Sequence, residues 1–317
     1  MITWRCALLC SVAIWGVTVL SAQTAPRYPA DAKPPVKTSA AEPKATQPPA
    51  SIDPKEIVRR SVETDHHNWD LAQNYTFQQR EIEKQVGKSG EVKSTEIKTY
   101  EINFYYGEEY QRLVARNDKP LSAEEKKKED EKLDKWLAKR RDRSPEDQQK
   151  EWAKRKKRRD EQRAFLHDVI NAYDFKLVGE EKVDGSDAWV IEATPRKDFH
   201  PTQPHAEILS KIKGKVWIEK QQYNWVKVDA ENFDTISFGL VLARIHPGSH
   251  FSLEQTHLND EVWLPRRFHV NGGMRIALLK NLNGEQEDTF SNYRKYSTTT
   301  RILPGVQEVP SDQTPPK

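Results

Sequence analysis

Apolar and polar residues alternate with a period of two through most of the chain after Asn74, in short stretches separated by turn sequences. Stretches such as "NYTFQQREIEKQV" and "DAWVIEATP" are rich in β-branched and aromatic residues, which is typical of strands with one buried face. The pairs Asp184-Gly185 and Asn283-Gly284, and the Asn-Gly-Gly at 271–273, supply positive φ in tight hairpins. About eleven strands joined by short links are predicted, so the pattern favours one long antiparallel meander that curls up.

A helix is expected before the first strand. In "DPKE", Asp53 is placed as the N-cap, Pro54 at the first helical position, and Glu56 where it can cap back. Apolar residues from Ile57 onward then recur at helical spacing, which predicts about 18 residues of amphipathic helix. Its apolar side needs a surface to cover.

The first 22 residues have the order of a cleaved secretory signal peptide: a charge at Arg5, an apolar run, and small residues near Ala22. Both cysteines, Cys6 and Cys10, fall inside it, so the mature chain would have no disulfide and no thiolate site. The ranges 23–52 and 304–317 are rich in Pro and polar residues and are predicted to be a disordered linker and tail. An exported domain over 53–303 remains.

One predicted strand, 235–246, is apolar on both faces, with the large residues Ile236, Phe238, Leu240 and Leu242 alternating with mostly small ones. Such a strand needs something packed against each face, for example a helix on one side and an apolar interior on the other. The pattern fits a ligand cavity and a filled core equally well. If there is a cavity, its candidate lining residues are Trp189, Ile191, Phe238, Leu240, Leu242, Ile276 and Leu278.

The segment 122–163 carries 17 Lys/Arg and 12 Asp/Glu in 42 residues. Caps at Ser122 and Ser144 predict two helices, roughly 122–142 and 145–172, that form a helical hairpin. Phe165 and Val169 should dock its far end on the β domain, while the tip projects into solvent. Six consecutive residues in it are basic: Lys154, Arg155, Lys156, Lys157, Arg158 and Arg159. This basic block either contacts anionic headgroups, cell-wall polymers or an acidic partner, or it is a solvated helix face. Export makes nucleic acid an unsuitable partner.

No motif of an enzyme is present: the chain has no Gly-rich phosphate loop, no G-x-S-x-G and no H-E-x-x-H. Histidines at 200 and 205, and at 246 and 250, lie in Pro-containing loops without acidic or thiolate residues at a matching spacing. We therefore expect no catalytic residues, no metal site and no cofactor.

Three stretches, "GSDAWVIEATP", "KIKGKVWIEKQQYNWVKVDAEN" and "DEVWLPRRFHV", resemble the outer-membrane lipoprotein-sorting (LolA-like) superfamily. Members have a strand ending in Pro, a strand pair of the type "kvwidk…vkv", and then "wlP"; here these correspond to 189–195, 215–228 and 262–265. Trp225 stands where Pro is frequent, and the segment 122–172 would be an insertion. The resemblance implies a mainly antiparallel α+β fold, an about eleven-stranded curved sheet or unclosed β-barrel with a lid helix, to which the charged helical hairpin is added.

The same resemblance implies an exported, non-catalytic protein of the periplasm that holds an acyl chain or a lipoprotein in an apolar interior, as a monomer. The polar residues with which the superfamily's carrier holds or releases the acyl group cannot be aligned with this sequence, so no residue here is assigned that role. The alternative is an envelope interaction, structural or stress-sensing protein that uses the charged hairpin against an anionic membrane surface or another envelope protein.

Overall fold

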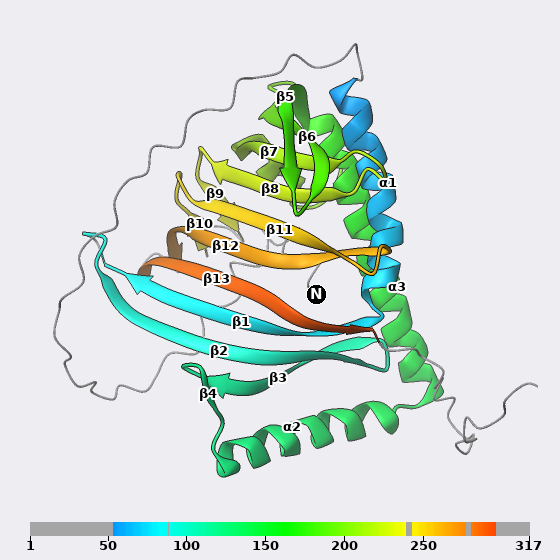
Figure 1. Ribbon diagram of the computed structural model, residues 1–317, viewed down its shortest axis with the longest axis vertical. Helices are drawn as coiled ribbons and strands as arrows, with labels where there is room; N and C mark the ends of the chain where they lie inside the picture. Colours follow the sequence, from blue (N-terminus) through cyan, green and yellow to red (C-terminus); the bar gives the residue numbers. More distant parts are fainter. Residues whose placement is uncertain (1–52, 88, 239–242, 277–279, 296–317) are drawn as a thin grey trace, which may run out of the picture.

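The computed structural model describes residues 53–87, 89–238, 243–276 and 280–295. They form one antiparallel sheet with three α-helices and a 3-10 helix, η2 (Ala206–Lys211). Figure 1 shows the sheet, with α1 and α3 crossing its strands and α2 below the strand β3. The helices are α1 (Pro54–Ala72), α2 (Ala123–Arg141) and α3 (Pro145–Ala172). The strands are β1 (Tyr75–Val86), β2 (Val92–Tyr105), β3 (Glu108–Arg116), β4 (Lys119–Pro120), β5 (Tyr173–Val183), β6 (Ser186–Pro195), β7 (Ile212–Glu219), β8 (Trp225–Asn232), β9 (Ile236–Phe238), β10 (Ala243–Ile245), β11 (His250–Leu258), β12 (Val262–Ile276) and β13 (Lys280–Lys295).

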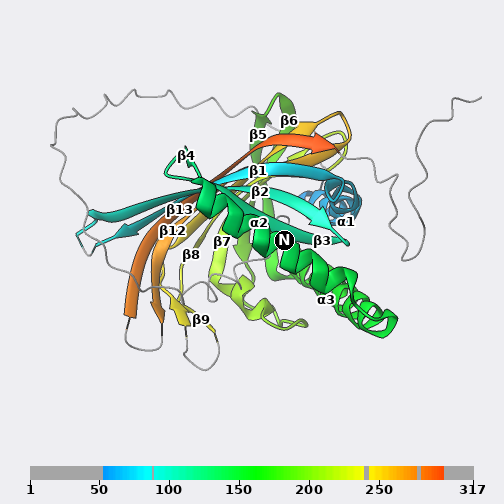
Figure 2. The same ribbon diagram turned by 90° about the horizontal axis from the view of Figure 1, so that it is seen from below.

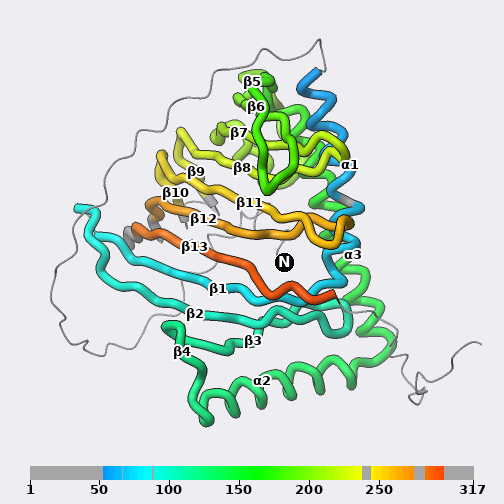
Figure 3. Tube along the Cα trace, in the orientation of Figure 1, coloured from blue at the N-terminus to red at the C-terminus, as the bar shows by residue number. Residues whose placement is uncertain are grey.

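The sheet is not closed into a barrel. Its order is β4-β3-β2-β1-β13-β12-β11-β8-β7-β6-β5, with β9 and β10 attached beside β12. The first and last long strands, β1 and β13, therefore pair in the middle of the sheet, where Figure 3 shows them side by side. Seen from below, β12 and β13 bend along their length (Figure 2). The predicted mainly antiparallel, curved and unclosed sheet is confirmed, with 13 strands instead of about eleven.

Helix α1 begins where the sequence predicts. The Asp53 side chain accepts a hydrogen bond from the backbone N–H of Lys55, and Pro54 occupies the first turn. Glu56 does not cap back, because its carboxylate is engaged by Arg59 and Arg60. The apolar face of the helix packs on the sheet: Ile57 and Val58 form a buried cluster with residues of β6 and β7.

Two of the three glycine-containing sequences predicted as turns, 271–273 and Asn283-Gly284, are not turns. Asp184 and Gly185 do form one, with φ of 49° and 83°. By contrast, β12 and β13 run uninterrupted through the other two pairs, and Gly272 lies opposite Gly284 in the ladder. These glycines provide room instead of positive φ: a Cβ on Gly272 would lie 2.1 Å from Ser249 Oγ. The absence of a side chain thus permits close approach inside a bent sheet.

The segment 235–246 is not one strand. Its two ends pair with each other as β9 and β10, so that Phe238 lies opposite Ala243 and Ile236 opposite Ile245. β10 also pairs with the end of β12. Ile236 and Ile245, which pair with each other, are both buried.

The charged segment forms the two predicted helices with both serine caps, but the hairpin is not confirmed. α2 packs against β3, where the Trp136 ring lies 5.1 Å from that of Tyr110. Arg140 and Arg143 bind Glu108 at 2.6 Å each. α3 instead packs against α1 and η2. Phe165 and Val169 join a cluster with Tyr173 of β5 and Leu209 of η2, so this end of α3 docks on the β domain. Each helix therefore has its own partner in the β domain.

The predicted signal peptide, linker and tail lie outside the described residues. Within the described ranges, no helix combines the length and the apolar character that crossing a bilayer requires.

Candidate ligand-binding cavity

A cavity of about 270 Å³ lies between α1, α3 and the sheet. α1 contributes Val58, Val62 and Trp69, which recur at helical spacing on one face. Phe165, Leu166 and Val169 of α3 face it from the side. The sheet, with η2, supplies its remaining apolar wall: Tyr173, Phe175, Ala193, Leu209, Ile212, Val216, Trp225, Val228, Ala230 and Phe251. The wall thus combines the amphipathic faces of two helices with one face of β5 to β8 and β11.

Two polar side chains within this wall are hydrogen-bonded inside the protein. Asp65 accepts a 2.7 Å hydrogen bond from the Trp225 indole N–H. Ser61 donates to the Val58 carbonyl oxygen one turn earlier. Burial raises the pKa of Tyr173, so its hydroxyl stays neutral. Ionisable side chains, among them Lys213, Lys215 and Arg163, lie at exposed positions of the lining. The interior therefore offers apolar contact with few free polar groups.

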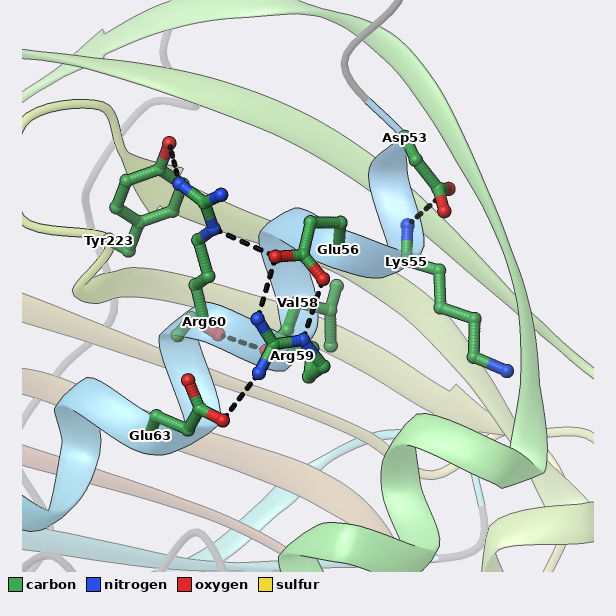
Figure 4. Close-up of polar contacts among 9 residues, drawn as sticks. Asp53, Lys55, Glu56, Val58, Arg59, Arg60, Glu63 and Tyr223 are labelled. Atoms are coloured by element: carbon green, nitrogen blue, oxygen red, sulfur yellow. Dashed lines mark hydrogen bonds and ion pairs between the residues drawn. The ribbon is translucent and has the colours of Figure 1, made fainter.

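Hydrogen bonds and ion pairs fix α1 over the cavity. The Glu56 carboxylate lies between Arg59 and Arg60, at 2.6 and 2.9 Å, and Arg60 donates to the Tyr223 hydroxyl at 3.2 Å (Figure 4). Tyr223 belongs to the turn between β7 and β8. Hydrogen bonds from Arg59 and Arg60 lower the pKa of Glu56 to about 2. The start of the helix is thereby attached to the edge of the sheet that it covers.

A second attachment lies further along α1. The Asn68 side chain donates to the backbone carbonyl of Trp263 at 2.9 Å and accepts from its N–H at 2.7 Å. Both residues are buried. One amide thus completes the hydrogen bonding of a strand residue and sets the position of the helix.

Two of the predicted lining residues, Trp189 and Ile191, are buried next to the cavity but do not line it. They belong to the cluster beneath the first turns of α1, with Ile57 and Ile218. The Trp189 ring lies 5.4 Å from that of Tyr223. They support the helix that covers the cavity.

The other predicted lining residues are in the region of β9, β10 and the end of β12. Phe238 and Ile276 are in β9 and β12, each paired with Ala243 of β10, and their side chains are outside the described part. Leu240, Leu242 and Leu278 lie outside the described residues.

The basic block 154–159 occupies the middle of α3 and has two sides. Lys154, Lys156 and Lys157 pair with acids of the same helix and are exposed, as is Arg158. Arg155 and Arg159 are half-buried and lie against the β domain: Arg155 donates to the Tyr106 carbonyl at 3.0 Å, and the Arg159 guanidinium lies 5.5 Å from the Trp69 ring centroid. Contact of the block with an anionic surface stays a prediction.

Most of the cavity wall was not predicted as a site. The spacing of apolar residues from Ile57 onward indicated a buried helix face, and Phe165 and Val169 were expected to dock. What brings these residues together is the crossing of α1 and α3 over the same strands, which local patterns do not encode. Among the described residues, no group of three or more His, Cys, Asp or Glu side chains is arranged to hold a metal ion.

No protein-family model matches the chain, and no curated protein matches its sequence. Solved structures do match. A DUF1329 family protein from Desulfovibrio piger is 14% identical, with a TM-score of 0.29, and the match covers 78% of this chain and 96% of that one. A putative outer membrane lipoprotein-sorting protein domain from Vibrio parahaemolyticus is 12% identical (TM-score 0.30; 78% and 95% covered). A LolA superfamily protein from Nitrosomonas europaea is 10% identical (TM-score 0.24; 78% and 95% covered). The last two are of the superfamily that the strand pattern of this chain resembles.

Proposed function

We propose that this chain is an exported, non-catalytic binding protein of the cell envelope whose cavity under α1 and α3 takes the apolar chain of an amphiphile. The observation that supports it is the cavity wall, in which most side chains are apolar and Ser61 and Asp65 are hydrogen-bonded within the protein. Pockets with apolar walls and few polar groups select ligands by apolar area.

The magnitudes favour a long chain over a short one. Each buried methylene contributes about 0.8 kcal/mol, while association costs at least about 4 kcal/mol. Five or so methylenes therefore only offset the lower bound of the cost, and measurable affinity requires more. The residues of α1 that line the cavity span Val58 to Trp69, which is roughly 16 Å of helix. An extended chain fits that length.

A cavity-filling substitution tests the proposal. Ala193 lines the cavity on β6, and its neighbour Thr194 is exposed and points to the opposite face. We expect Ala193→Phe to weaken binding of palmitate, measured by titration calorimetry, by about tenfold or more, and Thr194→Phe to leave it unchanged. Thermal unfolding of both variants checks that the fold is retained.

Equal affinity of the wild type, Ala193→Phe and Thr194→Phe for palmitate would show that the acyl chain of palmitate binds outside this cavity. A folded wild type that binds neither palmitate nor palmityl alcohol would overturn the proposal.

A further inference from the structure

A second cavity, of about 450 Å³, lies beside the first and has a different chemical character. Phe77, Phe104 and Leu264 form part of its wall, but four arginines of α2 and α3 also line it: Arg140, Arg155, Arg158 and Arg159. The two cavities adjoin, because Trp69 and Arg159 line both of them. One of the two adjoining cavities is thus mainly apolar and the other is lined in part by arginines.

One acid in this wall, Glu108, contacts several arginines at once. Glu108 is approached by Arg140 and Arg143 at 2.6 Å each, and by Arg155 at 3.6 Å. Desolvation acts to raise the pKa of Glu108, but hydrogen bonds from Arg143 and Arg140 outweigh it and lower the pKa below its ordinary value. One carboxylate thus stands against three guanidinium groups. Two further acids line the cavity, Glu151, which pairs with Lys154, and Glu109, which accepts from Gln111.

Arg158 and Arg159 add to this excess of positive charge. Among the residues that the structure describes, neither forms a salt bridge to a carboxylate, and Arg159 rests over the ring of Trp69 instead. A guanidinium held on an aromatic face keeps its donors available at the edge, and its planar fork matches carboxylate and phosphate oxygens. Arg159 at the border of the two cavities, and Arg158 in the wall of the second, therefore present cationic donors next to the apolar cavity.

We propose that the two cavities bind one anionic amphiphile, with its chain in the apolar cavity and its carboxylate or phosphate head group at Arg158 and Arg159. This inference rests on the proposed function and specifies the ligand class. It predicts that the acid head group contributes affinity beyond that of the chain, through charge-assisted hydrogen bonds in a partly water-excluded site.

The test compares two ligands that share a chain and differ in the head group, palmitate and palmityl alcohol, on the full protein. Arg158→Gln/Arg159→Gln removes two positive charges from the wall of the second cavity. Lys126→Gln/Lys127→Gln removes two exposed charges of α2 that line neither cavity, and so controls for net charge. We expect the arginine variant to lose about ten- to hundredfold in palmitate affinity and less than about twofold in alcohol affinity. The lysine variant should match the wild type for both ligands.

Inorganic phosphate distinguishes a lipid head group from a free anion. Weak competition by phosphate against palmitate, lost in the arginine variant, supports a head-group site; tight phosphate binding that is unaffected by Ala193→Phe would overturn the amphiphile in favour of a free anion. If palmitate and the alcohol bind equally and Arg158→Gln/Arg159→Gln changes neither, the head-group site is wrong while the apolar cavity stands. If neither amphiphile binds, the proposed function itself fails.

Discussion

The guanidinium of Arg159 lies 5.5 Å from the ring centroid of Trp69, and these two side chains line both the apolar and the basic cavity. Trp69 is on α1 and Arg159 on α3, so the pair also links the two helices that cover the sheet. Because one member is aromatic and the other cationic, the change from apolar to polar surroundings occurs within a single contact.

Truncating Trp69 should weaken amphiphile binding. Trp69→Ala removes apolar wall from both cavities and the surface on which Arg159 rests, and a lost aromatic contact of about 1.5–3 kcal/mol corresponds to about ten- to hundredfold in palmitate affinity. The control is Trp152→Ala on α3, since Trp152 is 55% exposed. Calorimetric titration of both variants measures the effect. Equal losses in the two would contradict a role specific to the cavity.

Asn68 should matter for stability more than its neighbour. Asn68→Ala leaves the buried N–H and C=O of Trp263 without their partners, at a cost of about 1–3 kcal/mol. His67→Ala, at the preceding and exposed position of α1, should change the free energy of unfolding by less than about 0.5 kcal/mol. Urea unfolding of both variants measures the difference. Similar losses of unfolding free energy in the two variants would show that the Asn68–Trp263 hydrogen bonds do not contribute to stability.

The contacts of Glu56 predict a pH dependence. Its pKa in the folded protein is about 2, lowered from an ordinary value of 4.5 by hydrogen bonds from Arg59 and Arg60. Since the folded state favours the ionised form, this stabilisation is present above about pH 4.5 and is lost as the pH falls towards 2. Glu56→Gln should therefore be less stable than the wild type at neutral pH, by an amount that disappears in strong acid. A difference in urea midpoint that stays constant from neutral pH to about pH 2 would refute this.

Gly272 is predicted to tolerate no side chain while Ser249 stands beside it. A Cβ would lie 2.1 Å from Ser249 Oγ and 2.4 Å from its Cβ, so Gly272→Ala should cost about 1–3 kcal/mol through overpacking. Ser249→Gly in the same chain removes both contacts and should restore part of the loss. At Gly179 in β5 an added Cβ meets nothing within 4 Å, which makes Gly179→Ala the matched control. A neutral Gly272→Ala would show that the bent ladder adapts.

Local sequence signals were sufficient for most elements of the fold. The N-cap at Asp53, the serine caps of α2 and α3, and the Asp184-Gly185 turn depend on contacts within a few residues, and all are present in the structure. The same local rules were misleading at Gly272 and Gly284. A glycine that admits a neighbouring strand and a glycine that supplies positive φ are identical in sequence, and only the pairing of β12 with β13 distinguishes them.

The site depended on contacts that sequence spacing does not show. The hairpin is not confirmed, and the sequence did not predict that Trp136 and Arg140 contact Tyr110 and Glu108 on β3, 26 and 32 positions earlier in the chain. The same placement brings Arg155 and Arg159 to the sheet side of α3, whereas the block 154–159 gave no indication of which cations face inward. Strand alternation did identify Trp189 and Ile191 as inward-facing, but not the path of α1, which covers them and leaves the cavity next to them.

Native mass spectrometry of the protein purified from its native cells without delipidation tests the binding claim most directly. We predict one added mass per chain, corresponding to an amphiphile with a long acyl chain, that is retained by Thr194→Phe and absent from Ala193→Phe. A wild-type protein that carries no added mass, and acquires none when incubated with palmitate, would contradict the account.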